Sequence, residues 1–128
     1  MSTLAPKKVL IVDDTPDIVQ FLVVRLRAEG FNTLTAFSGH DGLVKAQEER
    51  PDLIILDVMM PQLNGFQVCR KLKEDPELEP IPVIFLTAKD QPSDRFWGEE
   101  VGAAAYLTKP VNPREVAEEV KRLLAEAE

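Results

Sequence analysis

The 128 residues of this chain suffice for one compact domain and are too few for two ordinary ones. Hydrophobic residues make up 45% of the chain and charged residues 29%, which indicates a globular protein rather than a disordered one. The net charge of −7 argues against direct binding of nucleic acid, which depends on Lys and Arg side chains that neutralise phosphates. A single domain over residues 1–128, with a core at about 8–124, is therefore expected.

The lack of a secretory signal in the sequence and the presence of a single cysteine predict a cytoplasmic protein. No apolar run approaches the roughly 20 residues needed to span a bilayer, so no membrane insertion is expected. The N-terminus also lacks the apolar segment and cleavage site of a secretory signal. Cys69 is the one cysteine in the chain, so neither a disulfide nor a cysteine-based metal site is available.

The predicted elements begin with a buried strand over residues 9–12. Thr15 is a candidate cap and Pro16 suits the first turn of a helix, which ends at Gly30. The helix face expected to be buried contains Ile18, Phe21, Leu22 and Leu26. Residues 31–36 read as a weaker strand. Residues 38–41 then resemble a capping box that opens a helix through about residue 49.

The middle of the chain repeats this alternation. Residues 53–56 form a fully apolar third strand that is followed by Asp57. Asn64 begins a helix whose shared face contains Phe66, Cys69 and Leu72. Residues 82–86 form the fourth strand, which ends at Thr87.

The last elements are a helix, a short strand and a final helix. The first of these contains Trp97 and Val101 four residues apart, and residues 104–107 form the fifth strand. Asn112 as a cap and Pro113 in the first turn open the final helix. The residues expected to be buried by that helix are Val116, Val120, Leu123 and Leu124.

The strands read as continuous apolar runs, which is typical of strands covered on both faces. Because helices of about 10 to 15 residues separate them, right-handed crossovers and a parallel sheet are expected. The predicted fold is a (βα)5 doubly wound three-layer sandwich.

Polar side chains stand where the predicted strands end. The first strand is followed by Asp13 and Asp14, the third by Asp57, the fourth by Thr87, and the fifth is closely followed by Lys109. Ligands of an open parallel sheet bind beyond the carboxyl ends of its strands, so these side chains should converge. Three carboxylates in one crevice repel each other unless a cation intervenes, and such hard oxygen ligands favour Mg²⁺.

This set of residues suits phosphoryl transfer. A carboxylate beside a cation can attack a phosphoryl donor and form an aspartyl phosphate. The metal and Lys109 would offset charge on the transferred group, and the Thr87 hydroxyl would hydrogen-bond the product phosphate. Taken singly, each residue also has a structural interpretation, as a strand end, a helix cap or a turn residue, but their joint occurrence at four strand ends favours a site.

The motifs VDD at 12–14, LDVMMP at 56–61, LTA at 86–88 and YLTKP at 106–110 resemble the receiver domain of bacterial two-component response regulators. The resemblance covers roughly residues 8–124, and it implies a flavodoxin-like, five-stranded parallel sheet in the order 2-1-3-4-5. It also implies that Asp57 accepts the phosphoryl group, that Asp14 and Asp57 ligate Mg²⁺ directly, and that Asp13 supports the metal through water.

Further roles follow from the same resemblance. Met59 would contribute its backbone carbonyl to the metal, and Thr87 and Lys109 would bind phosphoryl oxygens, with a cis bond before Pro110. Thr87 and Tyr106 would form a switch that reshapes the face made by the Trp97 helix, the fifth strand and the last helix. A target protein would bind that face.

The resulting hypothesis is a phosphoacceptor switch rather than an enzyme, with self-catalysed phosphoryl transfer and autodephosphorylation. Its donor would be a sensor histidine kinase or a phosphotransfer protein, and it would be a monomer or a weak, phosphorylation-dependent dimer. The stretch at 87–111 further resembles single-domain regulators of twitching motility driven by type IV pili, and chemotaxis control is a related possibility.

Three alternatives stay open. The chain could be a receiver that binds partners without phosphorylation, although it has lost none of the expected residues. It could be a hydrolase, although Met59 stands where aspartyl-phosphate phosphatases have a second acid. It could also be the receiver part of a longer DNA-binding or cyclase protein. His40 is interpreted as part of a helix start and Cys69 as core.

Overall fold

The three-dimensional structure is a computed structural model that describes residues 6–88 and 99–127. Its sheet contains β1 (Lys8–Val12), β2 (Asn32–Ala36), β3 (Leu53–Asp57), β4 (Val83–Thr87) and β5 (Ala105–Thr108). The strands are parallel and lie in the order β2-β1-β3-β4-β5, so the predicted fold and strand order are confirmed.

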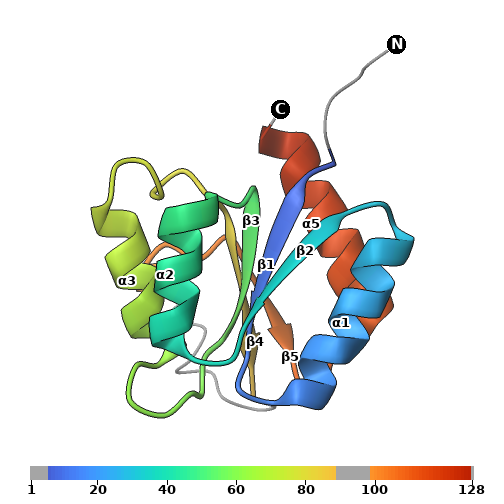
Figure 1. Cartoon of the computed structure of the whole chain (residues 1–128), viewed down its shortest axis with the longest axis horizontal. Coiled ribbons are helices and arrows are strands. Elements are labelled where there is room, and N and C mark those ends of the chain that lie inside the picture. The colour runs from blue at the N-terminus through green and yellow to red at the C-terminus, as the bar shows by residue number, and fades with distance from the viewer. Residues whose placement is uncertain (1–5, 89–98, 128) are drawn as a thin grey trace.

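Helices cover both faces of the sheet. They are α1 (Pro16–Ala28), α2 (Gly39–Glu49), α3 (Gly65–Glu74) and α5 (Pro113–Ala127). In Figure 1, α1 and α5 lie on one side of the sheet, and α2 and α3 lie on the other. Most of the helix expected around Trp97 falls on residues 89–98, outside the described part of the chain.

Two apolar clusters fill the spaces between the sheet and its helices. Because these clusters cover both faces of the sheet, β3 and β4 are buried along their whole length. One cluster joins alternate strand residues to α2 and α3, and includes Leu10, Phe85 and Cys69. The other joins the opposite strand faces to α1 and α5, and includes Ile11, Leu22 and Val120. The burial of Val116, Val120, Leu123 and Leu124 in α5 confirms the predicted face of that helix.

The buried face of α1 differs from the predicted one. Val19, Leu22 and Leu26 are buried, whereas Ile18 is only half-buried. The side chain of Phe21 is 65% exposed, so its predicted burial was wrong. Successive residues of a helix point in directions about 100° apart. The rotation of α1 that buries Leu22 therefore turns Phe21 towards solvent, and Val19 is buried in its place.

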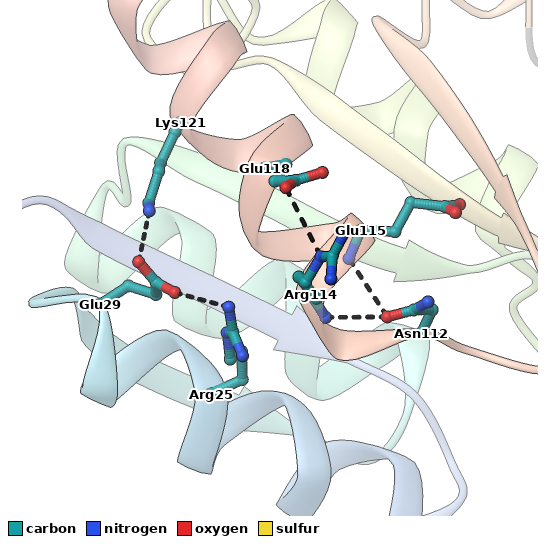
Figure 2. A network of polar contacts seen from close by, with 7 residues as sticks. All are labelled: Arg25, Glu29, Asn112, Arg114, Glu115, Glu118 and Lys121. Atoms are coloured by element: carbon teal, nitrogen blue, oxygen red, sulfur yellow. Dashed lines mark hydrogen bonds and ion pairs between the residues drawn. The ribbon is translucent and has the colours of Figure 1, made fainter.

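The helix ends follow their sequence signals with one exception. Thr15 occupies the N-cap of α1 but its side chain makes no capping hydrogen bond, and Gly30 ends the helix with a φ of 95°. In α2, the Ser38 side chain accepts a hydrogen bond from the amide of Asp41 at 3.1 Å. Figure 2 shows the Asn112 side chain accepting hydrogen bonds from the amides of Arg114 and Glu115, at 3.0 and 3.3 Å.

Within residues 6–88 and 99–127, the helices are all too short or too polar to cross a membrane.

Candidate phosphoacceptor and metal site

The three predicted acids meet at the carboxyl edge of the sheet, the lower edge in Figure 1. Val12, the last residue of β1, pairs with Leu56 in the parallel register, so Asp13 and Asp57, which follow these two residues in the chain, come side by side. One carboxylate oxygen from each of Asp13, Asp14 and Asp57 lies within 4.8 Å of the others. Asp13 and Asp57 are buried, at 0% and 2% exposure, whereas Asp14 is exposed to solvent.

Lys109 completes the cluster. Its Nζ lies 3.1 Å from Asp57 Oδ1 and 3.4 Å from Asp13 Oδ2. The backbone amide of Lys109 donates a hydrogen bond of 2.7 Å to the carbonyl of Thr87, which fixes the β5–α5 connection against the end of β4. The Lys109–Pro110 peptide bond is cis, as the sequence motif predicts.

The charges in this cluster are strongly coupled. Burial, and then the neighbouring charge of Asp13, raise the pKa of Asp57 to about 6, against the opposing influence of Lys109. Burial acts to lower the pKa of Lys109, but the charges of Asp57 and Asp13 outweigh it and the pKa is raised. Lys109 is therefore protonated at neutral pH and offsets only part of the negative charge.

The cluster suits a hard divalent cation. Asp13 Oδ1 accepts a hydrogen bond from the amide of Thr15 at 2.9 Å, which orients the carboxylate. The other oxygen, Asp13 Oδ2, is buried, and the ammonium of Lys109 lies 3.4 Å from it without meeting hydrogen-bond geometry. One ammonium shared between two buried carboxylates leaves acceptor capacity that a cation or water can satisfy. An all-oxygen donor set of this kind fits Mg²⁺.

Met59 lies at the mouth of the cluster. Its backbone amide is 3.3 Å from Asp57 Oδ1 and donates a hydrogen bond to it, while its side chain is 67% exposed. The backbone of Met59 is thus held against the carboxylate of Asp57. Its predicted role as a carbonyl ligand stays a prediction.

Thr87 and Tyr106 lie on the two strands beside the acids. Thr87 is buried, at 6% exposure, and pairs with Thr108 across the β4–β5 ladder. Tyr106 is half-buried and pairs with Phe85, with ring centroids 6.3 Å apart and planes inclined at 53°. The two predicted switch residues are therefore on adjacent strands, two residues apart in the register of the ladder.

Gly65 is a site residue that the sequence analysis treated only as a helix start. A β-carbon at this position would lie 2.5 Å from the carbonyl oxygen of Asp57 and 2.9 Å from Cα of Val58. The amide of Gly65 also donates a hydrogen bond of 3.0 Å to the carbonyl of Val58. The signal in the sequence is a glycine at the first helical position directly after the Asp57 loop.

Two other candidate residues have structural interpretations. His40 is exposed in the first turn of α2. Cys69 is fully buried, and its thiol lies 3.4 Å from the carbonyl of Val101, to which it donates a hydrogen bond. Burial raises the pKa of this thiol to about 11, so Cys69 is a core residue, as predicted.

Known proteins are similar to this chain in sequence and in fold. Residues 9–121 match the response regulator receiver domain family. Protein PilH of Pseudomonas aeruginosa is 43% identical over 118 residues, which cover 92% of this chain and 98% of PilH. The alkaline phosphatase synthesis transcriptional regulatory protein PhoP of Bacillus subtilis is 45% identical over 95% of this chain. The chain spans only 50% of the length of PhoP.

Solved structures agree with the sequence comparisons. The chemotaxis protein CheY4 of Vibrio cholerae superimposes with a TM-score of 0.87 at 36% identity. That match covers 92% of this chain and 98% of CheY4. A CheY-like receiver domain protein from Methanospirillum hungatei superimposes with a TM-score of 0.88 at 30% identity, over 95% of this chain and 96% of that one.

Proposed function

Because the chain belongs to the response regulator receiver domain family, whose members are signalling switches of two-component systems, we propose that Asp57 is its phosphoacceptor. The observation that carries this proposal is the position of the Asp57 carboxylate. It is buried at the carboxyl edge of the sheet, 3.1 Å from the ammonium of Lys109 and beside the oxygens of Asp13 and Asp14. Asp57 is the one acid of the cluster that terminates a central strand.

The phosphoryl donor is a phosphohistidine of a sensor histidine kinase or phosphotransfer protein. An oxygen of ionised Asp57 attacks the phosphorus, so a new O–P bond forms while the N–P bond breaks and its electron pair returns to the imidazole nitrogen. The raised pKa of about 6 still leaves Asp57 mostly ionised at pH 7. Its burial removes competing water from the attacking oxygen.

Mg²⁺ is the cofactor of this proposal. Asp13, Asp14, Asp57 and the backbone carbonyl of Met59 would hold the ion, with Asp14 the most accessible of the acids. When bound, Mg²⁺ neutralises charge on the acids and on the phosphoryl oxygens. The three clustered carboxylates share the single ammonium of Lys109, and this excess of negative charge supports the assignment.

Lys109 and Thr87 bind the phosphoryl oxygens in this proposal. The Lys109 ammonium already lies between two carboxylates and is 26% exposed, so it can turn towards a third anionic group. Its raised pKa keeps it charged throughout the reaction. The hydroxyl of Thr87, at the end of the strand next to β3, would donate a hydrogen bond to the same group.

The output is a protein contact. Drawing Thr87 towards the phosphoryl group changes the space beside it on β4, and Tyr106 on β5 responds by changing its packing. The face that contains β5 and α5, with the helix predicted around Trp97, then binds a target protein, without direct contact to nucleic acid. The chain acts in the cytoplasm as a monomer or as a weak dimer formed on phosphorylation.

The pathway is control of motility by type IV pili or of chemotaxis. The similarity to PilH over 98% of that protein and the motif resemblance at 87–111 support this assignment. The alternative is a receiver part of a longer regulator, and the match to half of a transcriptional regulatory protein favours it. Deletion of the gene should reduce pilus-dependent surface motility and leave swimming intact. Loss of swimming with normal surface motility would contradict the pilus assignment and favour control of chemotaxis.

The central test is labelling by a small phosphodonor such as acetyl phosphate. The wild-type protein should acquire one acid-stable, hydroxylamine-sensitive phosphoryl group, which EDTA should prevent. Asp57→Asn should abolish the labelling because an amide is a poor nucleophile. Asp17→Asn is a matched control, since Asp17 is an exposed acid in the first turn of α1 and should label normally. Stoichiometric labelling of Asp57→Asn, or labelling in EDTA, would contradict the proposal.

A further inference from the structure

The start of α2 makes an unusually close contact with the loop that follows Asp57, residues 58–64. A β-carbon on Gly39 would lie 2.5 Å from the carbonyl oxygen of Leu63 and 2.8 Å from Cγ2 of Val68. It would also lie 3.1 Å from Cβ of Leu63. The nearest of these atoms belongs to a peptide group, which cannot rotate away as a flexible side chain does. Any side chain at position 39 must therefore move a backbone segment.

The helix is the less movable partner in this contact. Three residues further on, a β-carbon at Gly42 would lie 2.9 Å from Cγ1 of Val12, so α2 also lies directly against β1. Leu43 and Ala46 anchor the same face in the core. The ammonium of Lys45 donates a hydrogen bond to the carbonyl of Thr35 at the edge of the sheet. Displacement of α2 would break these contacts together.

The loop is held at its two ends and by the buried side chain of Met60, but among the described residues its backbone makes no hydrogen bond to the sheet backbone between Val58 and Asn64. The amide of Val58 donates to the carbonyl of Leu86 at 3.1 Å, and Asn64 forms a reciprocal capping box with Gln67. Between those ends, Gln62 has a left-handed φ of 68°, and the side chains of Met59 and Pro61 are exposed. A methyl group at position 39 would therefore displace the loop backbone at Leu63, which follows the exposed residues Pro61 and Gln62, rather than the helix.

That displacement would reach the phosphoacceptor site. Met59 lies four residues before Leu63, and its amide donates the 3.3 Å hydrogen bond to Asp57 Oδ1. The loop is also short, so Leu63 cannot shift without changing the backbone that leads to Met59. In Figure 1 this loop runs beneath the lower ends of α2 and α3, below the site edge of the sheet.

We propose that Gly39 is a positioning residue for the phosphoacceptor site. Because this first residue of α2 has no side chain, it allows residues 58–63 to follow their observed path. That path sets the placement of the Met59 backbone beside Asp57, and with it the affinity for Mg²⁺. This inference rests on the proposed function of Asp57. Gly39 touches neither the acids nor the transferred group and acts only through Leu63.

The test compares Gly39→Ala with Gly30→Ala. Gly30 has open space around it but a φ of 95°, so alanine there introduces backbone strain at the opposite edge of the sheet without touching the loop. In metal-free protein, the NMR amide shifts of residues 58–60, 62 and 63 should move in Gly39→Ala and stay unchanged in Gly30→Ala. Mg²⁺ affinity, measured by titration calorimetry, should fall about tenfold in Gly39→Ala, as it does when residues supporting metal ligands are altered.

Labelling by acetyl phosphate provides the functional readout. Gly39→Ala should need about tenfold more Mg²⁺ for half-maximal labelling, a change that high Mg²⁺ corrects. Gly30→Ala should match wild type within twofold. If Gly39→Ala does not fold, Gly39→Ala/Val68→Ala is compared with Val68→Ala, since removing the Val68 methyls leaves only the contact with Leu63.

The outcomes separate the two proposals. If wild type and Asp57→Asn label equally, the proposed function is wrong. If wild type labels on Asp57 but the Gly39 variants keep normal Mg²⁺ affinity and unshifted loop amides, the role of Gly39 is refuted. An equal loss of Mg²⁺ affinity in Gly30→Ala would also refute it, because the effect would then follow general destabilisation.

Discussion

The two helix layers begin their helices in opposite ways. On one face of the sheet, α1 and α5 begin with Pro16 and Pro113. On the other face, α2 and α3 begin with Gly39 and Gly65. Proline restricts φ to a helical value before folding, whereas glycine allows another backbone to approach where a β-carbon would collide.

This difference separates two helix starts that should tolerate a substitution from two that should not. The α1–α5 layer is joined at its surface by side chains, with Glu29 pairing with both Arg25 and Lys121 (Figure 2). The α2–α3 layer lies against the backbone of the Asp57 loop through its two glycines. Long side chains can adjust to a substitution, but a peptide group in van der Waals contact cannot. Of the four helix starts, the two next to the phosphoacceptor loop should therefore be the sensitive ones.

The largest expected effect is that of Gly65→Ala. The added methyl would meet the carbonyl oxygen of Asp57 at 2.5 Å, so either α3 or the end of β3 must move. We expect the free energy of unfolding to fall by about 3 kcal/mol, measured by urea denaturation. Labelling of Asp57 should fall as well. A loss of unfolding free energy below about 1 kcal/mol would be no larger than ordinary backbone strain. Such a result would contradict the proposed difference between the glycine and the proline helix starts.

Asp57→Asn should have the next largest effect, and it should be stabilising. The folded pKa of about 6 lies above the ordinary value of 3.8, so the stability that protonated Asp57 contributes is present below about pH 4 and lost as pH rises through 6. In metal-free protein at pH 7, Asp57→Asn should raise the free energy of unfolding by up to about 2 kcal/mol.

The pH profile provides the control for this prediction. The advantage of Asp57→Asn should shrink steadily between pH 7 and pH 4, and added Mg²⁺ should stabilise wild type more than the variant. A constant difference across that range would show that the effect is not electrostatic. The effect of Asp57 on the free energy of unfolding would then come from packing at the carboxyl edge of the sheet and not from its charge.

Pro16→Ala should be milder, although it also changes the first residue of a helix. Pro16 is exposed, and alanine can adopt the same backbone conformation, so the main change is greater freedom of the unfolded chain. We expect a loss of about 1 kcal/mol or less in urea denaturation, with unchanged Mg²⁺ affinity. A loss as large as that of Gly65→Ala would contradict the comparison.

Phe21→Ala should have the smallest effect on stability. Its side chain is 65% exposed on the outer surface of α1, so its removal should change the free energy of unfolding by no more than about 0.5 kcal/mol. Leu22→Ala is the matched control, because Leu22 is fully buried and its loss should cost about 3 kcal/mol. Similar losses for the two variants would show that α1 is rotated relative to the present structure.

Phe21 illustrates what sequence periodicity does not resolve. A stripe of apolar residues that includes Phe21 predicts that α1 is amphipathic, but Val19 and Val24 are apolar neighbours of the stripe, so the pattern does not fix its exact direction. The contact with β1 and α5 decides which of them faces the core. Gly39 and Gly65 illustrate the same limit, since a glycine at a helix start indicates flexibility and only the neighbouring loop shows a close approach.

The sequence by itself determined the parallel (βα)5 fold, the boundaries of the described helices to within a few residues, and the set of residues at the carboxyl edge. Its motifs, through their resemblance to receiver domains, also determined the order of the strands. It could do so because parallel strands bring their ends to one edge, and the motif order assigns each polar residue to a strand. Tertiary structure alone decided that Asp13 and Asp57 are buried while Asp14 is exposed, and that Lys109 lies between the first two. Burial and charge coupling arise from segments far apart in the chain, so no local pattern encodes them.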